Sequence, residues 1–198
     1  MCPMHCERHY LTPLMEPESI VLIGASEREG SVGATLARNQ LEAGYGGRLF
    51  FINPRHRTLF GEPCYPNLRD TPLEKAPDLA VLCTALHHMP DIIESCGHAG
   101  IRYAVALPTS PQESGPKKSE LEHRLLARAR HYGLRLLGPD SLGLLRPRAG
   151  INLAYTRSHA IAGHIGLISQ SGALCSAGLD RPHAHHVALS PVTAQRHS

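Results

Sequence analysis

The most restrictive feature of the sequence is a series of short apolar runs that alternate with helix-like segments. Five such runs occupy residues 19–23, 48–52, 79–83, 103–107 and 135–137, each bounded by Pro or Gly. The intervening segments 31–43, 89–99 and 119–132 carry apolar residues at helical spacing. Strands that are buried on both faces are continuously apolar, as these runs are. The pattern therefore predicts an α/β fold, a Rossmann-like parallel sheet with helices on both faces.

The composition argues against nucleic-acid and membrane partners. The chain has 198 residues, of which 42% are hydrophobic, enough for a core of its own. Lys plus Arg number 20 against 17 Asp plus Glu, without a basic stripe, so we expect no nucleic-acid partner. No window approaches the ~18 apolar residues of a membrane helix, so we expect no membrane partner and a cytoplasmic location. Six cysteines are scattered without a pairing rhythm, which favours reduced thiols.

A glycine-rich loop follows the first apolar run. Gly24, Ser26, Gly30, Ser31 and Gly33 lie between this strand and the next predicted helix. Glycines allow the backbone to approach a diphosphate closely, and the free N–H groups at a helix start stabilise its charge. An ordinary tight turn would also use glycine. The position directly after the first strand favours nucleotide-type binding.

The end of the second apolar run indicates which nucleotide. An NAD site usually has Asp or Glu here to hold the ribose hydroxyls. This chain instead has Asn53 and Pro54, followed by Arg55, His56 and Arg57. Basic residues suit the phosphorylated ribose of coenzyme A or NADP better than a bare diol, although a solvated positive loop is the alternative.

The last third of the chain begins a new pattern. A short apolar strand at residues 166–169 precedes Ser169, Gln170, Ser171 and Gly172, which predicts the first strand and helix of a second domain. The serines form either an anion site or a simple helix cap. Residues 181–198 have no amphipathic period and are predicted to be disordered. At the other end, Cys2, His5, Cys6 and His9 could ligate zinc, but an unstructured extension over residues 1–12 is the favoured interpretation, and we predict no metal site.

Several short motifs occur together in one order. They are residues 14–26 (LMEPESIVLIGAS), 53–54 (NP), 60–66 (FGEPCYP), 77–84 (PDLAVLCT), 136–143 (LLGPDSLG), 150–152 (GIN) and 168–173 (ISQSGA). In this order and spacing they resemble the CoA-binding domain of NDP-forming acyl-CoA synthetases. The same domain forms the N-terminal part of large bacterial protein-lysine acetyltransferases. The resemblance implies a reaction in which acyl-CoA, NDP and phosphate are exchanged for acid, CoA and NTP.

The resemblance also implies a set of binding residues and a domain plan. Residues 13–150 would form the CoA-binding domain, and residues 151–180 a linker and the start of a flavodoxin-like ligase domain. The CoA diphosphate would lie at the glycine loop, and a phosphate at the later serine turn. The implied CoA residues are Gly24, Ala25, Ser26, Gly30, Ser31, Val32, Gly33, Asn53, Pro54, Arg55, Cys83, Thr84 and Pro108, and the implied phosphate residues are Ser169, Gln170, Ser171 and Gly172.

The chain departs from the family at several points. Asp140 stands where the family usually has Asn, and Pro108 begins a proline-containing segment where small residues and glycines are usual. The family's phosphorylated histidine and ATP-grasp module have no counterpart in these residues. We therefore expect CoA or acyl-CoA binding without catalysis, with a partner subunit or domain supplying the rest. The alternative is an NAD(P)-binding module of an oxidoreductase or redox sensor.

Overall fold

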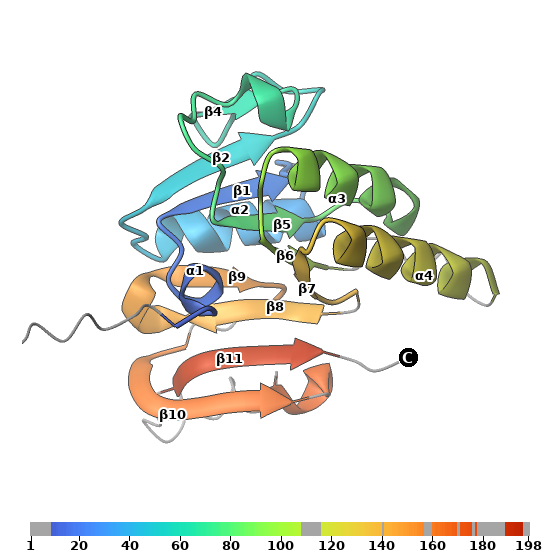
Figure 1. Ribbon diagram of the computed structural model, residues 1–198. Coiled ribbons are helices and arrows are strands. Elements are labelled where there is room, and N and C mark those ends of the chain that lie inside the picture. The colour runs from blue at the N-terminus through green and yellow to red at the C-terminus, as the bar shows by residue number, and fades with distance from the viewer. Residues whose placement is uncertain are drawn as a thin grey trace, which may run out of the picture.

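The predicted parallel sheet is the centre of the molecule. The computed structural model describes residues 9–107, 116–139, 141–156, 160–169, 171–175, 177 and, for the backbone, 189–195. Seven strands form one sheet in the order β3-β4-β2-β1-β5-β6-β7, and all neighbours are parallel except β3 and β4 (Figure 1). The strands are β1 Ser19–Ile23, β2 Arg48–Ile52, β3 Thr58–Leu59, β4 Glu62–Tyr65, β5 Leu79–Leu82, β6 Tyr103–Ala106 and β7 Arg135–Leu137.

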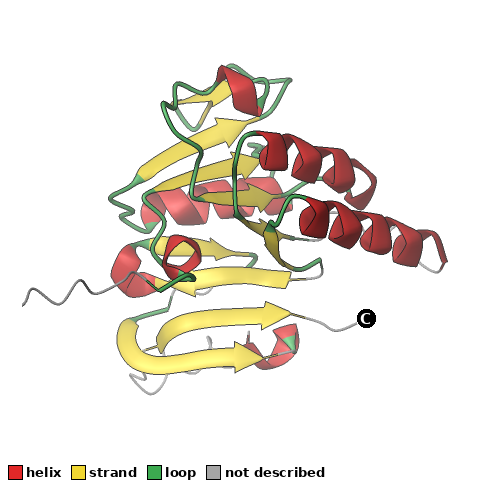
Figure 2. Cartoon of the chain, viewed as in Figure 1, coloured by secondary structure: helices red, strands yellow, loops and turns green. Residues whose placement is uncertain are grey.

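Helices cover both faces of this sheet (Figure 2). On one face, Ile20 and Leu22 of β1 pack with Leu36 and Ala37 of α2 (Val32–Glu42). Side chains alternate along a strand, so Val21 belongs to the opposite cluster with α3 (Met89–His98) and α4 (Pro116–His131). Four shorter helical pieces complete this part: α1 Thr12–Met15, η1 Leu68–Asp70, η2 Leu86–His88 and η3 Pro147–Ala149. The predicted fold class is confirmed.

A second, four-stranded sheet lies beside the first (Figure 1). Its strands are β8 Ser141–Arg146, β9 Ile151–Ala154, β10 Ala162–Ser169 and β11 Leu189–Gln195, in the order β10-β11-β8-β9. The β8–β9 hairpin packs on α2, where Asn39 Nδ2 donates to the carbonyl oxygens of Ala154 and Thr156, each at 3.0 Å. Gln40 Nε2 donates to the Gly150 carbonyl at 2.9 Å, and Gln40 Oε1 accepts the Asn152 N–H at 3.0 Å. Buried amides of α2 thus join the two sheets.

Three sequence expectations differ from this arrangement. Strand β10 pairs with β11 and, through it, with β8, so it is part of a mixed sheet that includes the hairpin on α2. The predicted loose tail is wrong for residues 189–195, which form β11, while residues 181–188 and 196–198 lie outside the described part. The N-terminal extension also makes contacts before residue 13, since the Tyr103 hydroxyl donates to the Tyr10 carbonyl.

No helix within the described residues is long and apolar enough to cross a membrane.

Candidate functional site

From the sheet topology, a ligand crevice is expected at the carboxyl ends of β1 and β5. These strands are neighbours, but the chain leaves β1 toward β2 on one side and returns to β5 on the other. Open α/β sheets bind ligands at such a switch point, because the connections diverge and leave a gap above the strand ends. The glycine loop after β1, the start of α2 and the residues after β5 meet here (Figure 1).

Two glycines bring these elements into close contact. Gly24 has φ +88°, and a Cβ there would lie 2.5 Å from the Cys83 carbonyl oxygen. A Cβ on Gly33 would lie only 2.2 Å from the Gly24 carbonyl oxygen. The absence of both side chains therefore lets the first turn of α2 rest directly on the end of β1, with the backbone of the β5 end beside it.

The loop between β1 and α2 is organised by serine hydroxyls. Ser26 Oγ accepts the Arg28 N–H at 3.0 Å, and Ser31 Oγ donates to the Arg28 carbonyl at 2.7 Å. Ser31 is also the N-cap of α2, since its Oγ accepts the Ala34 N–H at 3.2 Å. The first N–H groups of a helix have no intrahelical acceptor, so those of Val32 and Gly33 are left for a ligand at this end.

Asn53, at the end of β2, supports the loop from the side. Its Nδ2 donates to the Ala25 carbonyl at 2.7 Å, and its Oδ1 accepts the Arg55 N–H at 2.9 Å. Ala25 is fully buried, whereas Pro54 and Arg55 are exposed. The structure thus gives Asn53 a supporting role and leaves the guanidinium of Arg55 accessible at the rim.

The end of β5 contributes Cys83 and Thr84. Burial raises the pKa of the Cys83 thiol far above its ordinary value, so this thiol stays protonated and does not act as a nucleophile. Thr84 Oγ1 is buried and has no hydrogen-bond partner among the described residues. A buried hydroxyl without a hydrogen-bond partner costs roughly 1–3 kcal/mol of stability. Thr84 lies directly beside the glycine loop, since a Cβ on Gly24 would be 2.8 Å from Thr84 Cγ2.

The structure brings together most of the predicted CoA residues but not all of the predicted site. Those on the loop, β2 and β5 share one edge of the sheet, whereas Pro108 lies outside the described residues. At the serine turn, Ser171 N–H donates to Ser169 Oγ at 3.0 Å and Leu174 N–H to Ser171 Oγ at 3.3 Å. Both hydroxyls thus make local bonds there. Gln170 is outside the described part, and Gly172 begins a helical segment over residues 172–175, so a phosphate at this turn stays a prediction.

Sequence reasoning missed two residues near the loop. Glu27 Oε1 accepts the N–H of Phe60, which lies in the turn between β3 and β4, at 2.5 Å. Thirty-three positions separate the two residues, and no local motif signals the pair. An acidic residue inside a glycine loop is the only sequence signal that could have directed attention to it.

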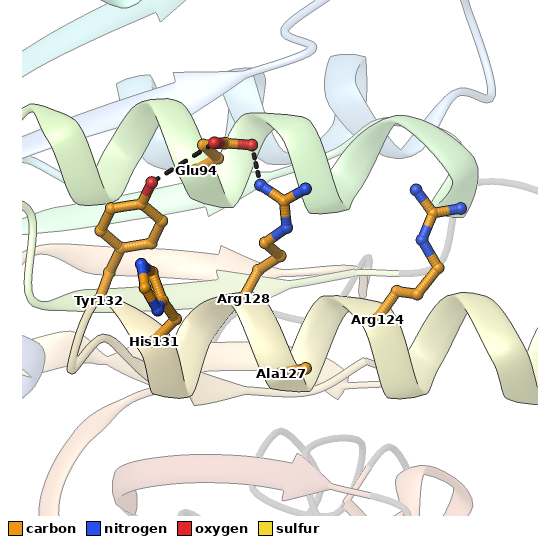
Figure 3. A pocket seen from close by; sticks show the side chains of 6 residues that line it. All are labelled: Glu94, Arg124, Ala127, Arg128, His131 and Tyr132. Atoms are coloured by element: carbon orange, nitrogen blue, oxygen red, sulfur yellow. Dashed lines mark hydrogen bonds and ion pairs between the residues drawn. The ribbon is translucent and has the colours of Figure 1, made fainter.

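A separate surface groove lies between α3 and α4 and is lined by charged side chains (Figure 3). Arg128 forms an ion pair with Glu94, and the Tyr132 hydroxyl donates to Glu94 Oε1 at 3.4 Å. None of the predicted binding residues lines this groove. Across the described part of the chain, no group of three or more His, Cys, Asp or Glu side chains could hold a metal ion.

Comparisons with known proteins identify the family of this chain. A family model described as a CoA binding domain matches residues 18–147. An ADP-forming acetate–CoA ligase of Archaeoglobus fulgidus is 32% identical over 181 residues, covering 91% of this chain and 26% of the ligase. The alpha subunit of such a ligase from Pyrococcus furiosus is 30% identical over 188 residues, covering 93% of this chain and 40% of the subunit.

The fold is also found in a solved structure. A dinucleotide-forming acetyl-coenzyme A synthetase of Candidatus Korarchaeum cryptofilum, in complex with phosphate and ADP, superposes with a TM-score of 0.84 at 33% identity. The match covers 93% of this chain and 39% of the synthetase. This chain therefore spans between about a quarter and two fifths of the length of these relatives. By its fold and the match over residues 18–147, the chain belongs to the CoA-binding domain family and is homologous to the corresponding part of ADP-forming acyl-CoA ligases.

Proposed function

We propose that this protein binds coenzyme A, free or acylated, in the crevice between the carboxyl ends of β1 and β5. The observation that supports this most strongly is the start of α2, which Gly24 and Gly33 bring directly onto the strand end. The helix N-terminus presents unpaired N–H groups and a positive dipole to the crevice. A diphosphate is the part of CoA that fits such a place.

Each part of the ligand has candidate partners. The N–H groups of Val32 and Gly33, with Ser26, would contact the diphosphate. Arg55 is the candidate for the ribose phosphate, because it is exposed beside Asn53 at the end of β2. The buried hydroxyl of Thr84 would bond to a polar atom deeper in the crevice. The absence of an acidic residue after β2 disfavours the bare ribose of NAD.

The wider activity follows from the relatives. We infer that the protein supplies the CoA site of an ADP-forming acid–CoA ligase, in which acyl-CoA, NDP and phosphate are converted to acid, CoA and NTP. This chain covers 26% and 40% of the two named relatives, so the nucleotide and phosphoryl-transfer steps are assigned to other polypeptide. These 198 residues alone should therefore bind CoA but not turn it over.

Exposed apolar side chains at a sheet edge support the need for additional polypeptide. Strand β10 is at the edge of the second sheet, and its Ile165 and Ile168 are 56% and 76% exposed. Leu174, just beyond the strand, is 58% exposed. Such clusters at an open sheet edge are typical of interaction surfaces. We propose that the ATP-grasp-containing part of the ligase, as a further domain or a separate subunit, covers this edge strand.

Two substitutions in β10 test the partner. The Ile165→Asp/Ile168→Asp double variant should lose binding to the ATP-grasp polypeptide encoded in the same genome, measured by co-purification of the two chains. CoA binding, at a different sheet, should be retained. Equal co-purification by the double variant and by the wild type would rule out β10 as the contact with this partner.

The CoA site is tested at Ser31, where the helix cap and the charge can be separated. Asp and Asn are both good N-caps, so Ser31→Asp and Ser31→Asn should both preserve α2. In calorimetric titration, the Asn variant should bind CoA within about threefold of the wild type. The Asp variant places a carboxylate beside the diphosphate and should bind at least roughly tenfold more weakly.

Parallel titrations with NADP and NAD discriminate against the oxidoreductase interpretation, since neither should bind with comparable affinity. Equal CoA affinity in the Asp and Asn variants would remove the diphosphate from this loop.

A further inference from the structure

The loop proposed to hold the CoA diphosphate contains an acidic residue, Glu27. A free carboxylate in this position would repel an anionic ligand. The structure gives the carboxylate a specific partner outside the loop, because Glu27 Oε1 accepts the backbone N–H of Phe60 at 2.5 Å. The Glu27 carboxylate therefore accepts a hydrogen bond from the β3–β4 turn.

The β3–β4 turn, to which Glu27 is hydrogen-bonded, is itself held by contacts with the core and with α2. Phe60 has φ +52°, a conformation that costs a non-glycine residue energy and persists only when the surroundings hold it. The preceding Leu59 is fully buried in the core, and the Arg38 guanidinium of α2 lies 5.9 Å from the centre of the Phe60 ring. Glu27 is thus tied to a point that is fixed relative to α2.

The remaining contacts of the loop show why this bond matters. The bonds from Ser26 and Ser31 to Arg28 are internal to the loop and its helix cap. Two further bonds leave the loop. One joins Ala25 to Asn53 at the end of β2, and the other joins Glu27 to Phe60 in the β3–β4 turn. The second connection lies nearer the middle of the loop, where the chain would otherwise depend on its own short-range bonds.

We propose that Glu27 is a positioning residue for the CoA diphosphate: its bond to Phe60 fixes the β1–α2 loop and keeps the carboxylate away from the anion. This inference rests on the proposed function, because it assigns a role in the same site. The proposed role explains why an acidic residue is compatible with an anion site in the same loop.

Three variants of Glu27 separate the acceptor from the charge. Glu27→Gln retains an acceptor oxygen at the same reach and loses the charge, so CoA affinity should stay within about twofold of the wild type. Glu27→Ala loses the acceptor and should bind CoA roughly fivefold more weakly. Glu27→Asp is one methylene shorter, so the acceptor is displaced while the charge is kept. It should bind most weakly, by roughly tenfold or more.

Glu29 provides the matched control. It is an exposed acid in the same loop, and its side chain makes no hydrogen bond or ion pair with another described residue. Glu29→Gln should leave CoA affinity unchanged or slightly higher. If Glu27→Ala and Glu27→Gln both bind CoA more tightly, as removal of a repulsive charge predicts, the positioning role is refuted.

A second measurement does not depend on CoA. Hydrogen exchange of the Phe60 amide in the ligand-free protein should be slow in the wild type and in Glu27→Gln, and at least roughly fivefold faster in Glu27→Ala. Unchanged exchange in Glu27→Ala would overturn the inference. Lack of CoA binding by the wild type would overturn the proposed function, and with it the ligand role of Glu27, whereas the exchange data would still report on the anchor itself.

Discussion

Replacement of Gly33 by alanine tests how α2 is seated on β1. A Cβ at this position would lie 2.2 Å from the Gly24 carbonyl oxygen and 3.2 Å from its carbon, where ordinary contact begins at 3.4 Å. Either the carbonyl or the first turn of α2 must therefore move by more than about 1 Å. The carbonyl has little freedom, because the Gly24 N–H donates to the Ile52 carbonyl at 2.9 Å.

The magnitude follows from two opposing effects. Overpacking of this kind costs about 3 kcal/mol at the upper end of the usual range, since the clash is with backbone and not with a flexible side chain. Alanine regains at most about 1 kcal/mol of helix propensity. We therefore expect Gly33→Ala to lower the free energy of unfolding by about 2 kcal/mol, which is roughly 4–8 °C in Tm for a chain of this length.

The assay is urea denaturation followed by far-ultraviolet circular dichroism. Gly46→Ala is the matched control, because a Cβ there meets nothing within 4 Å and it should change stability by less than about 0.5 kcal/mol. A Gly33→Ala protein as stable as this control would show that the helix is not seated as described. Because any side chain at Gly33 disturbs the fold and the ligand site together, Ser31 is the better position for a charge test.

Three further substitutions have expected outcomes. Thr84→Val removes the buried hydroxyl that lacks a partner, so the ligand-free protein should become more stable by about 1 kcal/mol in urea denaturation, while CoA affinity falls by roughly threefold or more in calorimetry. Gln40→Leu leaves the Gly150 carbonyl and the Asn152 N–H without their bonds to α2 and should cost about 2–4 kcal/mol by the same denaturation assay. Burial raises the pKa of the Cys96 thiol to about 12, so its stabilising contribution is full below the unfolded pKa near 9 and decreases as pH rises toward 12. Unfolding measured at pH 8.5 and 10.5 should show a loss of about 1–2 kcal/mol from this thiol, and Cys96→Val should remove that share of the pH dependence.

The first sheet could be predicted because its central strands β1, β5 and β6 are buried at every position and β2 and β7 flank them. Strands β1, β2, β5, β6 and β7 are therefore apolar at every position or nearly so, and the runs in the sequence coincide with them. Strands β3 and β4 were missed. They are only two and four residues long, and the strained backbone of Phe60 in their turn leaves no mark on the sequence.

The second sheet was harder for a different reason. Strand β8 contains Gly143 at φ +110°, where a Cβ would lie 2.0 Å from the Leu153 carbonyl, so a glycine that suggests a turn serves close strand packing. Strand β11 includes Pro191 and is supported by pairing with β8 and β10, which are distant in sequence. Local patterns do not report such pairing.

In the candidate site too, features with local requirements could be predicted from the sequence, and contacts between distant segments could not. Its glycines and serines were predictable, because a loop after a first strand has local requirements. The bond of Glu27 to Phe60 and the lack of a partner for Thr84 depend on chain segments that meet only in the folded protein.

The amides of Asn39 and Gln40 have a thermodynamic consequence for ligand binding. Because they bond to the backbone of the β8–β9 hairpin, α2 cannot shift or tilt without breaking hydrogen bonds at its far end. The opposite end of the same helix, at Val32 and Gly33, is therefore already immobile before any ligand arrives. Little configurational entropy is left to be lost there on association, so the attraction between the helix end and a diphosphate is expressed almost fully as affinity.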